Sequence, residues 1–324
     1  MTGEHLVIRF QTYAAAFVLA GIFSASPHAQ DFPSKTIRIV TAAAGGGSDF
    51  GARQLALGLA PVLGQPVVVE NRGSGVVQYD FLANSAPDGH SLVVSGGAFW
   101  IFPLIQKIPY DVVRDFVPIS LMSKKIIIVA IHPSVPAKSI KELIALAKAR
   151  PGQLNYASTV YGGPAHLAAE MFKSMAGVDI VNVPYKGNAP GIVALLSGEV
   201  QLTIIDAGEL MPHVKSGRLR ALAVTTAEPS PVTPGLPTVA ASGLPGYEIV
   251  GETVLYAPGK TPATIISRLN QESMRYLTRP ETKERFVAAG AEVVANSADQ
   301  FAAYVKADIA KWTRLIKKAG IRAN

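Results

Sequence analysis

"TIRIVTAAAGGGSDFGARQLALGLA" (residues 36–60) joins an apolar run to a helix-like stretch through consecutive glycines and a Ser-Asp pair. The same order of strand, glycine loop and helix returns in "LNYASTVYGGPAHLAAEMFKSMA" (residues 154–176). In the second copy, Gly163 suits the N-cap of the helix and Pro164 its first position. The repetition predicts one glycine loop in each of two domains, with the loops facing each other across a cleft where open α/β sheets bind ligands.

Short apolar runs, typical of strands buried on both faces, alternate with helical patterns along the rest of the chain. The alternation predicts an α/β fold with largely parallel sheets. A chain of 324 residues, 49% of them hydrophobic, is long enough for its core to divide between two domains. The expected strands are residues 36–42, 66–70, 91–95, 126–131, 154–158, 202–206 and 220–225.

The first thirty residues have the pattern of a secretion signal. Arg9 precedes the apolar stretch "YAAAFVLAGIFSAS" (residues 13–26), which is short for a membrane span. Small residues between Ser24 and Ala29 mark the cleavage zone. No later segment is long and apolar enough to span a bilayer, and no cysteine is present to carry a lipid anchor. We therefore expect a periplasmic protein with a cleaved signal peptide and no lipid anchor.

Composition excludes several functional classes. The absence of cysteine excludes disulfides, thiolate zinc sites and cysteine nucleophiles. The net charge of +7 arises from 30 basic and 23 acidic residues scattered along the chain. The basic cluster "KWTRLIKKAGIR" (residues 311–322) predicts a solvated amphipathic helix, because no basic stripe alternates with aromatic residues as a nucleic-acid surface would require. We expect no nucleic-acid partner.

Nucleotide and metal motifs are incomplete. Phe50 occupies the third glycine position of a dinucleotide fingerprint, and Val254 stands where a phosphate-binding loop ending in "GKT" (residues 259–261) needs its leading glycine. The histidines are widely spaced and form no helical metal pair. The sequence therefore predicts neither a cofactor nor a metal.

The glycine loops suit an anionic ligand. A helix N-terminus leaves backbone N–H groups unpaired and carries a partial positive charge, and glycines allow close backbone approach. Asp49 follows Ser48 at the expected helix start, where it either contacts ligand or complements the helix dipole. Asp206 ends an apolar strand and either lies at the cleft or caps the next helix.

The second loop has its own polar side chains. Ser158, Thr159 and His166 bracket this loop as hydrogen-bonding groups, and a catalytic Ser-His pair is the alternative interpretation. Tyr185 and Lys186 close another strand, where they either contact ligand or serve the turn.

Several stretches in fixed order closely resemble the Bug receptors, the extracytoplasmic solute-binding proteins of tripartite tricarboxylate transporters. The resemblance runs from about Phe32 to Ile321 and implies a type II periplasmic binding protein: two α/β domains around a cleft, joined by a two-strand hinge. The first domain would be discontinuous (residues 31–131 and 252–324), and the second would comprise residues 132–251. The matching stretches are "YASTVYGGPAHLAAEMF" (156–172), "VPYKGNAPGIVALLSGEVQLTIID" (183–206), "GRLRALAVT" (217–225), "LPTVAASGLPGYE" (236–248) and "LYAPGKTP" (255–262).

The resemblance also interprets the glycine loops. In Bug proteins the loops matching residues 43–49 and 158–166 close on a carboxylated ligand through backbone amides, hydroxyls and bridging waters. The first loop is then a carboxylate grip. With the polar clusters above, the expected ligand-binding residues of the two domains are Ala44, Gly46, Gly47, Ser48, Asp49, Ser158, Thr159, Tyr161, Gly162, Gly163, His166, Tyr185, Lys186 and Asp206.

A further pair of site residues comes from "SGGAFW" (residues 95–100), which follows an expected first-domain strand. Ala98 and Trp100 are expected at the mouth of the cleft, where the aromatic side chains would narrow the pocket and favour a flat or aromatic acid. The alternative is that Trp100 packs beneath the loop as part of the core.

We therefore expect a monomeric periplasmic receptor, not an enzyme, that captures a small carboxylate and delivers it to membrane permease subunits. The ligand classes expected are di- or tricarboxylates and aromatic acids. Two alternatives remain open at this point: a secreted hydrolase using Ser158 and His166, and a ligand-sensing subunit of a signalling system.

Overall fold

The computed structural model describes residues 32–42, 44–72, 76–158 and 164–319. The helices and strands given below all lie in one compact unit, which begins at Lys35. The expected signal peptide, residues 1–30, lies outside the described residues.

Six strands of the described chain form the first sheet: β1 (Ile37–Thr41), β2 (Val67–Asn71), β3 (Ser91–Ser95), β4 (Phe116–Lys125), β10 (Gly251–Pro258) and β11 (Ala291–Val293). Their order across the sheet is β11-β4-β10-β3-β1-β2. β1 runs parallel to β2 and β3, with Ile39 opposite Val69 and Leu92. β10 is antiparallel to both β3 and β4, and β11 is antiparallel to β4.

The second sheet, counted over the same described residues, has five strands: β5 (Ile127–Ile131), β6 (Asn155–Ser158), β7 (Val181–Pro184), β8 (Leu202–Asp206) and β9 (Arg220–Val224). Their order is β7-β6-β8-β5-β9. β6 is parallel to β7 and β8, whereas β5 is antiparallel to β8 and β9. Both sheets are therefore mixed, and the expectation of largely parallel sheets was wrong. A continuous apolar run marks a strand buried on both faces but carries no information about its direction.

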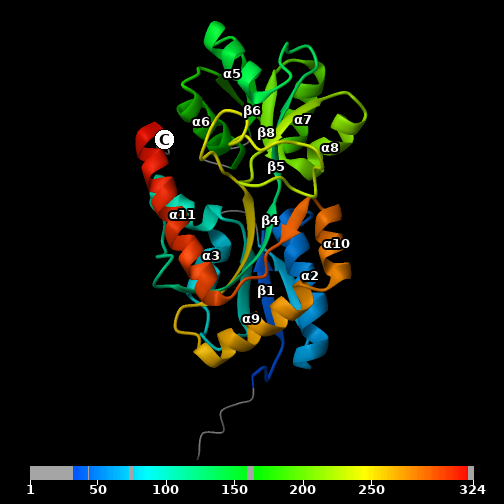
Figure 1. Ribbon diagram of the computed structural model, residues 1–324. Coiled ribbons are helices and arrows are strands. Elements are labelled where there is room, and N and C mark those ends of the chain that lie inside the picture. The colour runs from blue at the N-terminus through cyan, green and yellow to red at the C-terminus, as the bar shows by residue number, and fades with distance from the viewer. Residues whose placement is uncertain (1–31, 43, 73–75, 159–163, 320–324) are drawn as a thin grey trace, which may run out of the picture. The chain divides into compact units, whose positions relative to one another are not determined.

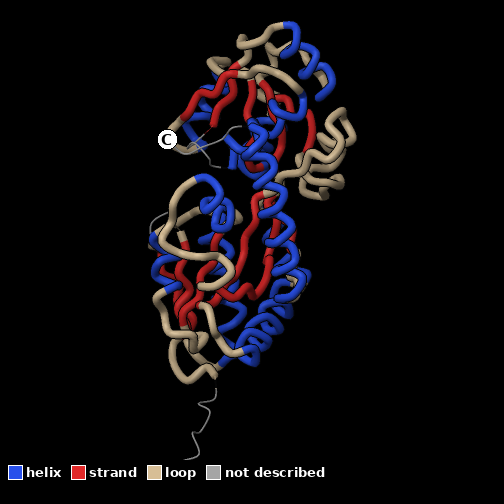
Figure 2. The backbone as a smooth tube through the Cα atoms, turned by 90° about the vertical axis from the view of Figure 1, so that its left-hand side faces the viewer, coloured by secondary structure: helices blue, strands red, loops and turns tan. Residues whose placement is uncertain are grey.

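Helices cover both sheets (Figures 1 and 2). Each glycine loop of the sequence leads from a strand into a helix, as expected: β1 into α2 and β6 into α6. The helices are α2 (Gly47–Leu63), α3 (Val77–Ala83), α4 (Ala98–Ile105), α5 (Ile140–Ala149), α6 (Pro164–Ala176), α7 (Asn188–Ser197), α8 (Ala207–Lys215), α9 (Ala263–Leu277), α10 (Pro280–Ala288) and α11 (Ala298–Ala319).

The chain passes between the two sheets at Ile126 and again between β9 and β10. Hydrogen bonds hold each passage: Ala207 N, at the start of α8, donates to Ile126 O over 2.7 Å, and within the second passage the Thr225 hydroxyl donates to Ile249 O over 2.6 Å. β5 belongs to the second sheet, so the first passage precedes the expected boundary at His132. The apolar run that continues through residues 126–131 conceals this passage, since no glycine or proline interrupts it.

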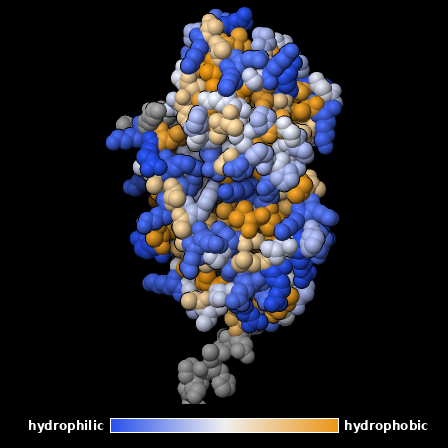
Figure 3. Space-filling model, viewed as in Figure 1, coloured by the Kyte–Doolittle hydropathy of each residue, from blue (hydrophilic) through white to orange (hydrophobic). Residues whose placement is uncertain are grey.

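The last helix, α11, has the expected amphipathic character. Trp312 and Ile316 are buried, whereas Arg314 and Lys317 are exposed. On the molecular face seen in Figure 3, hydrophilic and hydrophobic residues are interspersed. Within the described residues, no helix has the length and apolar character needed to cross a membrane.

Candidate functional site

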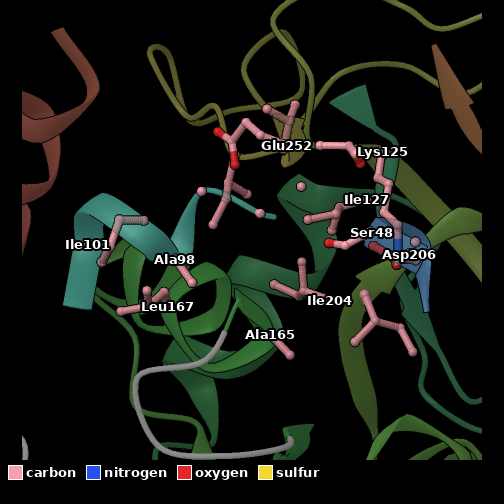
Figure 4. Close-up of a pocket in the computed structure, with 18 of the residues that line it drawn as sticks. Ser48, Ala98, Ile101, Lys125, Ile127, Ala165, Leu167, Ile204, Asp206 and Glu252 are labelled. Atoms are coloured by element: carbon pink, nitrogen blue, oxygen red, sulfur yellow. Dashed lines mark hydrogen bonds and ion pairs between the residues drawn. The ribbon is translucent and has the colours of Figure 1, made fainter. Parts of the chain in front are cut away.

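A cavity of about 680 Å³ lies where elements of both sheets meet. Figure 4 shows Ser48, Lys125 and Asp206 together on one side of this pocket, with Ala98, Ile101 and Leu167 on the other. A volume of this size is ordinary for a small-molecule site. The lining combines the beginnings of helices, apolar side chains and a few charged groups, and it includes Gly46, Gly47, Gly96, Gly97, Ile127, Asn188, Ile204, Glu252, Lys311 and Trp312.

The beginning of α2 presents backbone N–H groups to this cavity. Gly46 is the N-cap, and it makes no side-chain capping bond. The first intrahelical bond runs from Phe50 N to Gly46 O at 2.9 Å, so the N–H groups of Gly47 and Ser48 have no acceptor within the helix. Together with the helix dipole, these groups make this end of the cavity favourable for an anion.

Gly47 has a second role, because it makes room for Lys125. A Cβ atom at Gly47 would lie 2.1 Å from Lys125 Cε and 2.7 Å from Lys125 Nζ. The ammonium therefore lies directly against the beginning of α2. Its partner is the carboxylate of Asp206, the residue that ends β8 and precedes α8. About a quarter of each side chain remains exposed, with 26% for Lys125 and 22% for Asp206. Gly46, Gly47, Ser48 and Lys125 are called the α2 side of the cavity below.

Asp49 does not line the cavity. It stabilises the turn before α2 through hydrogen bonds of its carboxylate. Its carboxylate accepts hydrogen bonds from Gly45 N (3.0 Å), Arg53 Nε (3.0 Å) and Asn71 Nδ2 (2.8 Å). The hydrogen bond from Arg53 is the largest influence that lowers the pKa of Asp49, to about 2. Gly45 adopts a φ of +84°, a conformation that favours glycine. Asp49 thus holds the turn that orients the N–H groups of α2.

The cavity lining contains another charged group, Glu252 on β10, which lies apart from the Lys125–Asp206 pair in Figure 4. The Tyr304 hydroxyl donates to Glu252 Oε1 over 2.8 Å. Burial, and next the nearby Asp308, raise the pKa of Glu252 to about 7. Asp308 is itself bound by Lys311 Nζ at 2.6 Å. Glu252, Tyr304, Asp308 and Lys311 are called the Glu252 side below.

Five of the expected binding residues line this cavity, namely Gly46, Gly47, Ser48, Ala98 and Asp206. Others do not line it: Ala44, Asp49, Trp100, Ser158, His166, Tyr185 and Lys186. Ser158 instead faces a small neighbouring pocket beside α7. Thr159, Tyr161, Gly162 and Gly163 lie outside the described residues, as do Ala43 and residues 73–75.

Trp100 belongs to the core, the alternative that the sequence left open. Its side chain is 1% exposed, and its Nε1 donates to Asp308 Oδ2 over 2.8 Å. The adjacent Phe99 lies among aromatic rings, with its centroid 4.5 Å from that of Tyr79 and 4.7 Å from that of Tyr256. The tryptophan that lines the cavity is Trp312 of α11, which the sequence did not single out.

Ser158 and Tyr185, two of the polar residues around the second loop, donate hydrogen bonds to other side chains of the protein. The Ser158 hydroxyl donates to Asn182 Oδ1 over 2.6 Å, so its proton points toward an amide oxygen and not toward an imidazole. His166 is buried in α6, and burial lowers its pKa. The Tyr185 hydroxyl donates to Glu199 Oε1 over 2.9 Å. This geometry gives no support to a Ser158–His166 nucleophile.

The residues that the sequence did not indicate come from the passages between the sheets and from α11. Lys125 ends β4, and Glu252 lies near the start of β10. Lys311 and Trp312 lie in the cluster that the sequence identified only as an amphipathic helix. Glu252 is a charged residue inside the apolar strand "IVGETVLYAP". Because charged residues are seldom buried without a reason, this feature of the sequence could have indicated a functional role for Glu252.

Comparison with known proteins gives a consistent set of relatives. The family model described as "Tripartite tricarboxylate transporter family receptor" (TctC) matches residues 51–321. Protein BugT of Bordetella pertussis is 34% identical over 312 residues, which cover 94% of this chain and 96% of BugT.

Solved structures agree with this assignment. R. palustris Rpa4515 with adipate is 33% identical with a TM-score of 0.79, covering 90% of this chain and 99% of that one. The periplasmic binding protein BugD is 32% identical with a TM-score of 0.75, covering 90% and 100%. MatC from Rhodopseudomonas palustris with bound malate is 28% identical with a TM-score of 0.75, covering 88% and 100%.

Proposed function

Because the chain belongs to the TctC family of extracytoplasmic solute-binding receptors, we propose that its cavity captures a small organic carboxylate for a tripartite tricarboxylate-type transporter. The observation that carries this proposal is the α2 side of the cavity. There the unpaired N–H groups of Gly47 and Ser48 and the ammonium of Lys125 converge on one volume. N–H groups at a helix start and an ammonium are the donors that a carboxylate accepts best.

The rest of the cavity suits the body of an organic acid. Apolar side chains from four elements form its walls, so a hydrocarbon portion can be buried while the carboxylate remains bound. Two of the similar solved structures are described with adipate and with malate, both carboxylates. These ligands belong to those proteins, and they support the chemical class proposed here. The apolar residues concerned are Ala98, Ile101, Ile127, Leu167 and Ile204.

The proposed cellular location and partners of the protein rest on its family and on its sequence. We propose a periplasmic location after cleavage of the segment before about residue 30, and a monomeric receptor. The receptor would present its ligand-bound form to membrane permease subunits. Two domains, one around each sheet, would close on the ligand about the two passages between the sheets, with β5 in the second domain, which then begins near residue 126 instead of residue 132.

A screen of thermal unfolding against organic acids tests the proposal. The panel holds mono-, di- and tricarboxylates, aromatic acids and ω-amino acids, each beside the compound in which its carboxylates are replaced by amides as a control. At a free ligand concentration about 100 times the dissociation constant, an acid that binds only the folded state stabilises it by about 2.7 kcal/mol. We expect at least one acid, but not its amide, to raise the midpoint.

The same screen excludes the alternatives in part. A hydrolase would consume one of the amides in the panel, whereas a receptor returns its ligand unchanged after denaturation. A signalling role would share the ligand-induced closure, and only loss of uptake on deletion of the receptor separates transport from sensing. If no acid raises the midpoint, the proposal of a carboxylate receptor fails.

A further inference from the structure

Glu252 places a carboxyl group in a cavity whose other end attracts carboxylates. It is half-buried, and one oxygen, Oε1, accepts the hydrogen bond from Tyr304. The other oxygen, Oε2, is directed toward the start of α4, where a Cβ at Gly97 would lie 2.2 Å from it. Gly97 therefore leaves the space that this oxygen occupies. In Figure 4 the Glu252 carboxyl group lies apart from the Lys125–Asp206 pair.

Within the described residues, no cation forms an ion pair with this group: no Lys, Arg or His nitrogen lies within 4 Å of the Glu252 carboxylate. Lys311 acts on it only from a greater distance, lowering its pKa less than burial and Asp308 raise it. Lys311 is bound to Asp308, at 2.6 Å. Lys124, directly across the strand pair, lies over the Tyr304 ring at 5.1 Å. Two carboxylates thus share one paired ammonium on the Glu252 side, which leaves it with a formal charge of −1 when Glu252 is ionised.

The position of Glu252 also removes an anion site from the cavity. The first N–H groups of α4 would attract a ligand carboxylate, just as those of α2 do. Because the Glu252 carboxyl group already lies against the start of α4, a ligand carboxylate placed there would meet a second carboxyl at close range. The two sides of the cavity are therefore chemically opposite, and the α2 side alone is open to an anion.

We propose that this receptor selects acids with one carboxylate, bound on the α2 side, and a hydrogen-bond donor, best an ammonium, that binds Glu252 at the other end. The inference rests on the proposed function and narrows its ligand class to amino acids of the ω type and their relatives. A donor supplies the missing partner of Glu252, whereas a second carboxylate adds repulsion. The apolar walls accommodate the methylenes between the two ends.

Protonation of Glu252 should make the affinity for each class of ligand depend on pH. Because the pKa of Glu252 lies at about 7 in the free protein, the carboxyl is partly protonated near neutral pH. An ammonium binds the ionised form more tightly than the protonated one, so its affinity rises from pH 5.5 to pH 8 and its binding releases protons. A dicarboxylate favours the protonated form, so its affinity changes in the opposite direction. The titratable groups that face Glu252 are Lys124, Tyr256, Tyr304, Asp308 and Lys311.

Calorimetric titration of the full chain tests the inference. The probes are ω-amino acids from 4-aminobutanoate to 6-aminohexanoate, each paired with the dicarboxylate and the monocarboxylate of the same carbon number. For at least one length we expect the amino acid to bind about tenfold or more tighter than its paired acids, since a hydrogen bond to a charged group contributes about that factor or more to affinity.

The variant E252Q provides the decisive comparison. It retains the size of the side chain, and we expect it to lose the preference for amino acids, to bind dicarboxylates more tightly, and to bind with no proton release in buffers of different ionisation enthalpy. E284Q, an exposed change on α10, is the matched control and should behave as wild type. Thermal midpoints of both variants report on folding.

Two outcomes overturn the inference in different ways. If acids bind but E252Q has the same preferences and proton linkage as wild type, Glu252 does not recognise the ligand, and the proposed function still stands. If no acid of any kind binds wild type, both the inference and the proposed function fail.

Discussion

The two sides of the cavity differ in how they are built. The α2 side is largely local: Gly46, Gly47 and Ser48 come from one turn, and only Lys125 reaches it from another strand. The Glu252 side joins β10 to α11, whose residues meet only when the chain has folded. The first side presents backbone donors that any carboxylate can use. The second presents side chains that discriminate between acids, so affinity and selectivity have separate structural origins.

The largest expected effect is on the α2 side, from Gly47→Val. A branched side chain there would take the space of the Lys125 side chain, whose Cε lies 2.1 Å from the Cβ position. We expect carboxylate binding to be lost while the fold is retained, because Gly47 lies at the first position of α2. Leu57→Val, an exposed change on the same helix, is the control. Titration with the best acid of the screen measures both, and equal affinities would contradict the role of this turn.

Lys125→Met should have the next largest effect. It removes the cation of the α2 side and leaves Asp206 without its partner. The loss of a charge-assisted hydrogen bond predicts carboxylate affinity about ten- to a hundredfold weaker. Lys107→Met, an exposed change outside the cavity, should leave affinity unchanged. A Lys125→Met protein that binds carboxylates as wild type does would remove Lys125 from the site.

Asp206→Asn should change the affinity for carboxylates in the opposite direction from Lys125→Met. The ion pair with Asp206 competes with the ligand for the Lys125 ammonium. Removing the carboxylate frees the cation and removes repulsion, so we expect affinity for carboxylates to rise about threefold. A fall in affinity would show that Asp206 binds the ligand itself, for example through a ligand hydroxyl or amine. The double variant Lys125→Met/Asp206→Asn should abolish the gain.

The difference between local and long-range contacts also explains which features could be predicted from the sequence. The strand runs, the turn into α2 and the amphipathic last helix follow local rules of hydrophobic period and helix termini, and they appear in the structure as expected. Strand direction depends on how the chain passes between the sheets, which the apolar runs at β4, β5 and β10 do not encode.

Local rules also fail for side chains whose partners are remote. Trp100 was placed at the cavity, yet its N–H donates to Asp308 of α11, far along the chain. Lys125 and Glu252 gain their roles only from Gly47 and Gly97, which leave space for them. The family resemblance indicated the carboxylate grip, whereas the Glu252 side depends on contacts between β10 and α11, which are far apart in the sequence.

The smallest expected effect is that of Asp49→Asn on thermal stability, because Asp49 holds the turn before α2 without lining the cavity. The pKa of Asp49 is lowered to about 2 in the folded protein, below the value of about 3.9 expected in the unfolded chain. Its contribution to stability is therefore complete above about pH 4 and is lost as the pH falls toward 2. We expect Asp49→Asn to lower the thermal midpoint at pH 6, and the difference from wild type to shrink below pH 3. A difference that is independent of pH would show that charge is not what Asp49 contributes.

The most direct measurement is a crystal structure of the receptor with the acid that binds most tightly in the screen. The account predicts a carboxylate oxygen about 3 Å from the backbone nitrogens of Gly47 or Ser48 and from Lys125 Nζ, with the rest of the acid directed toward Glu252. A ligand bound outside this cavity, or one whose carboxylate lies against Glu252 while Lys125 remains paired with Asp206, would contradict it.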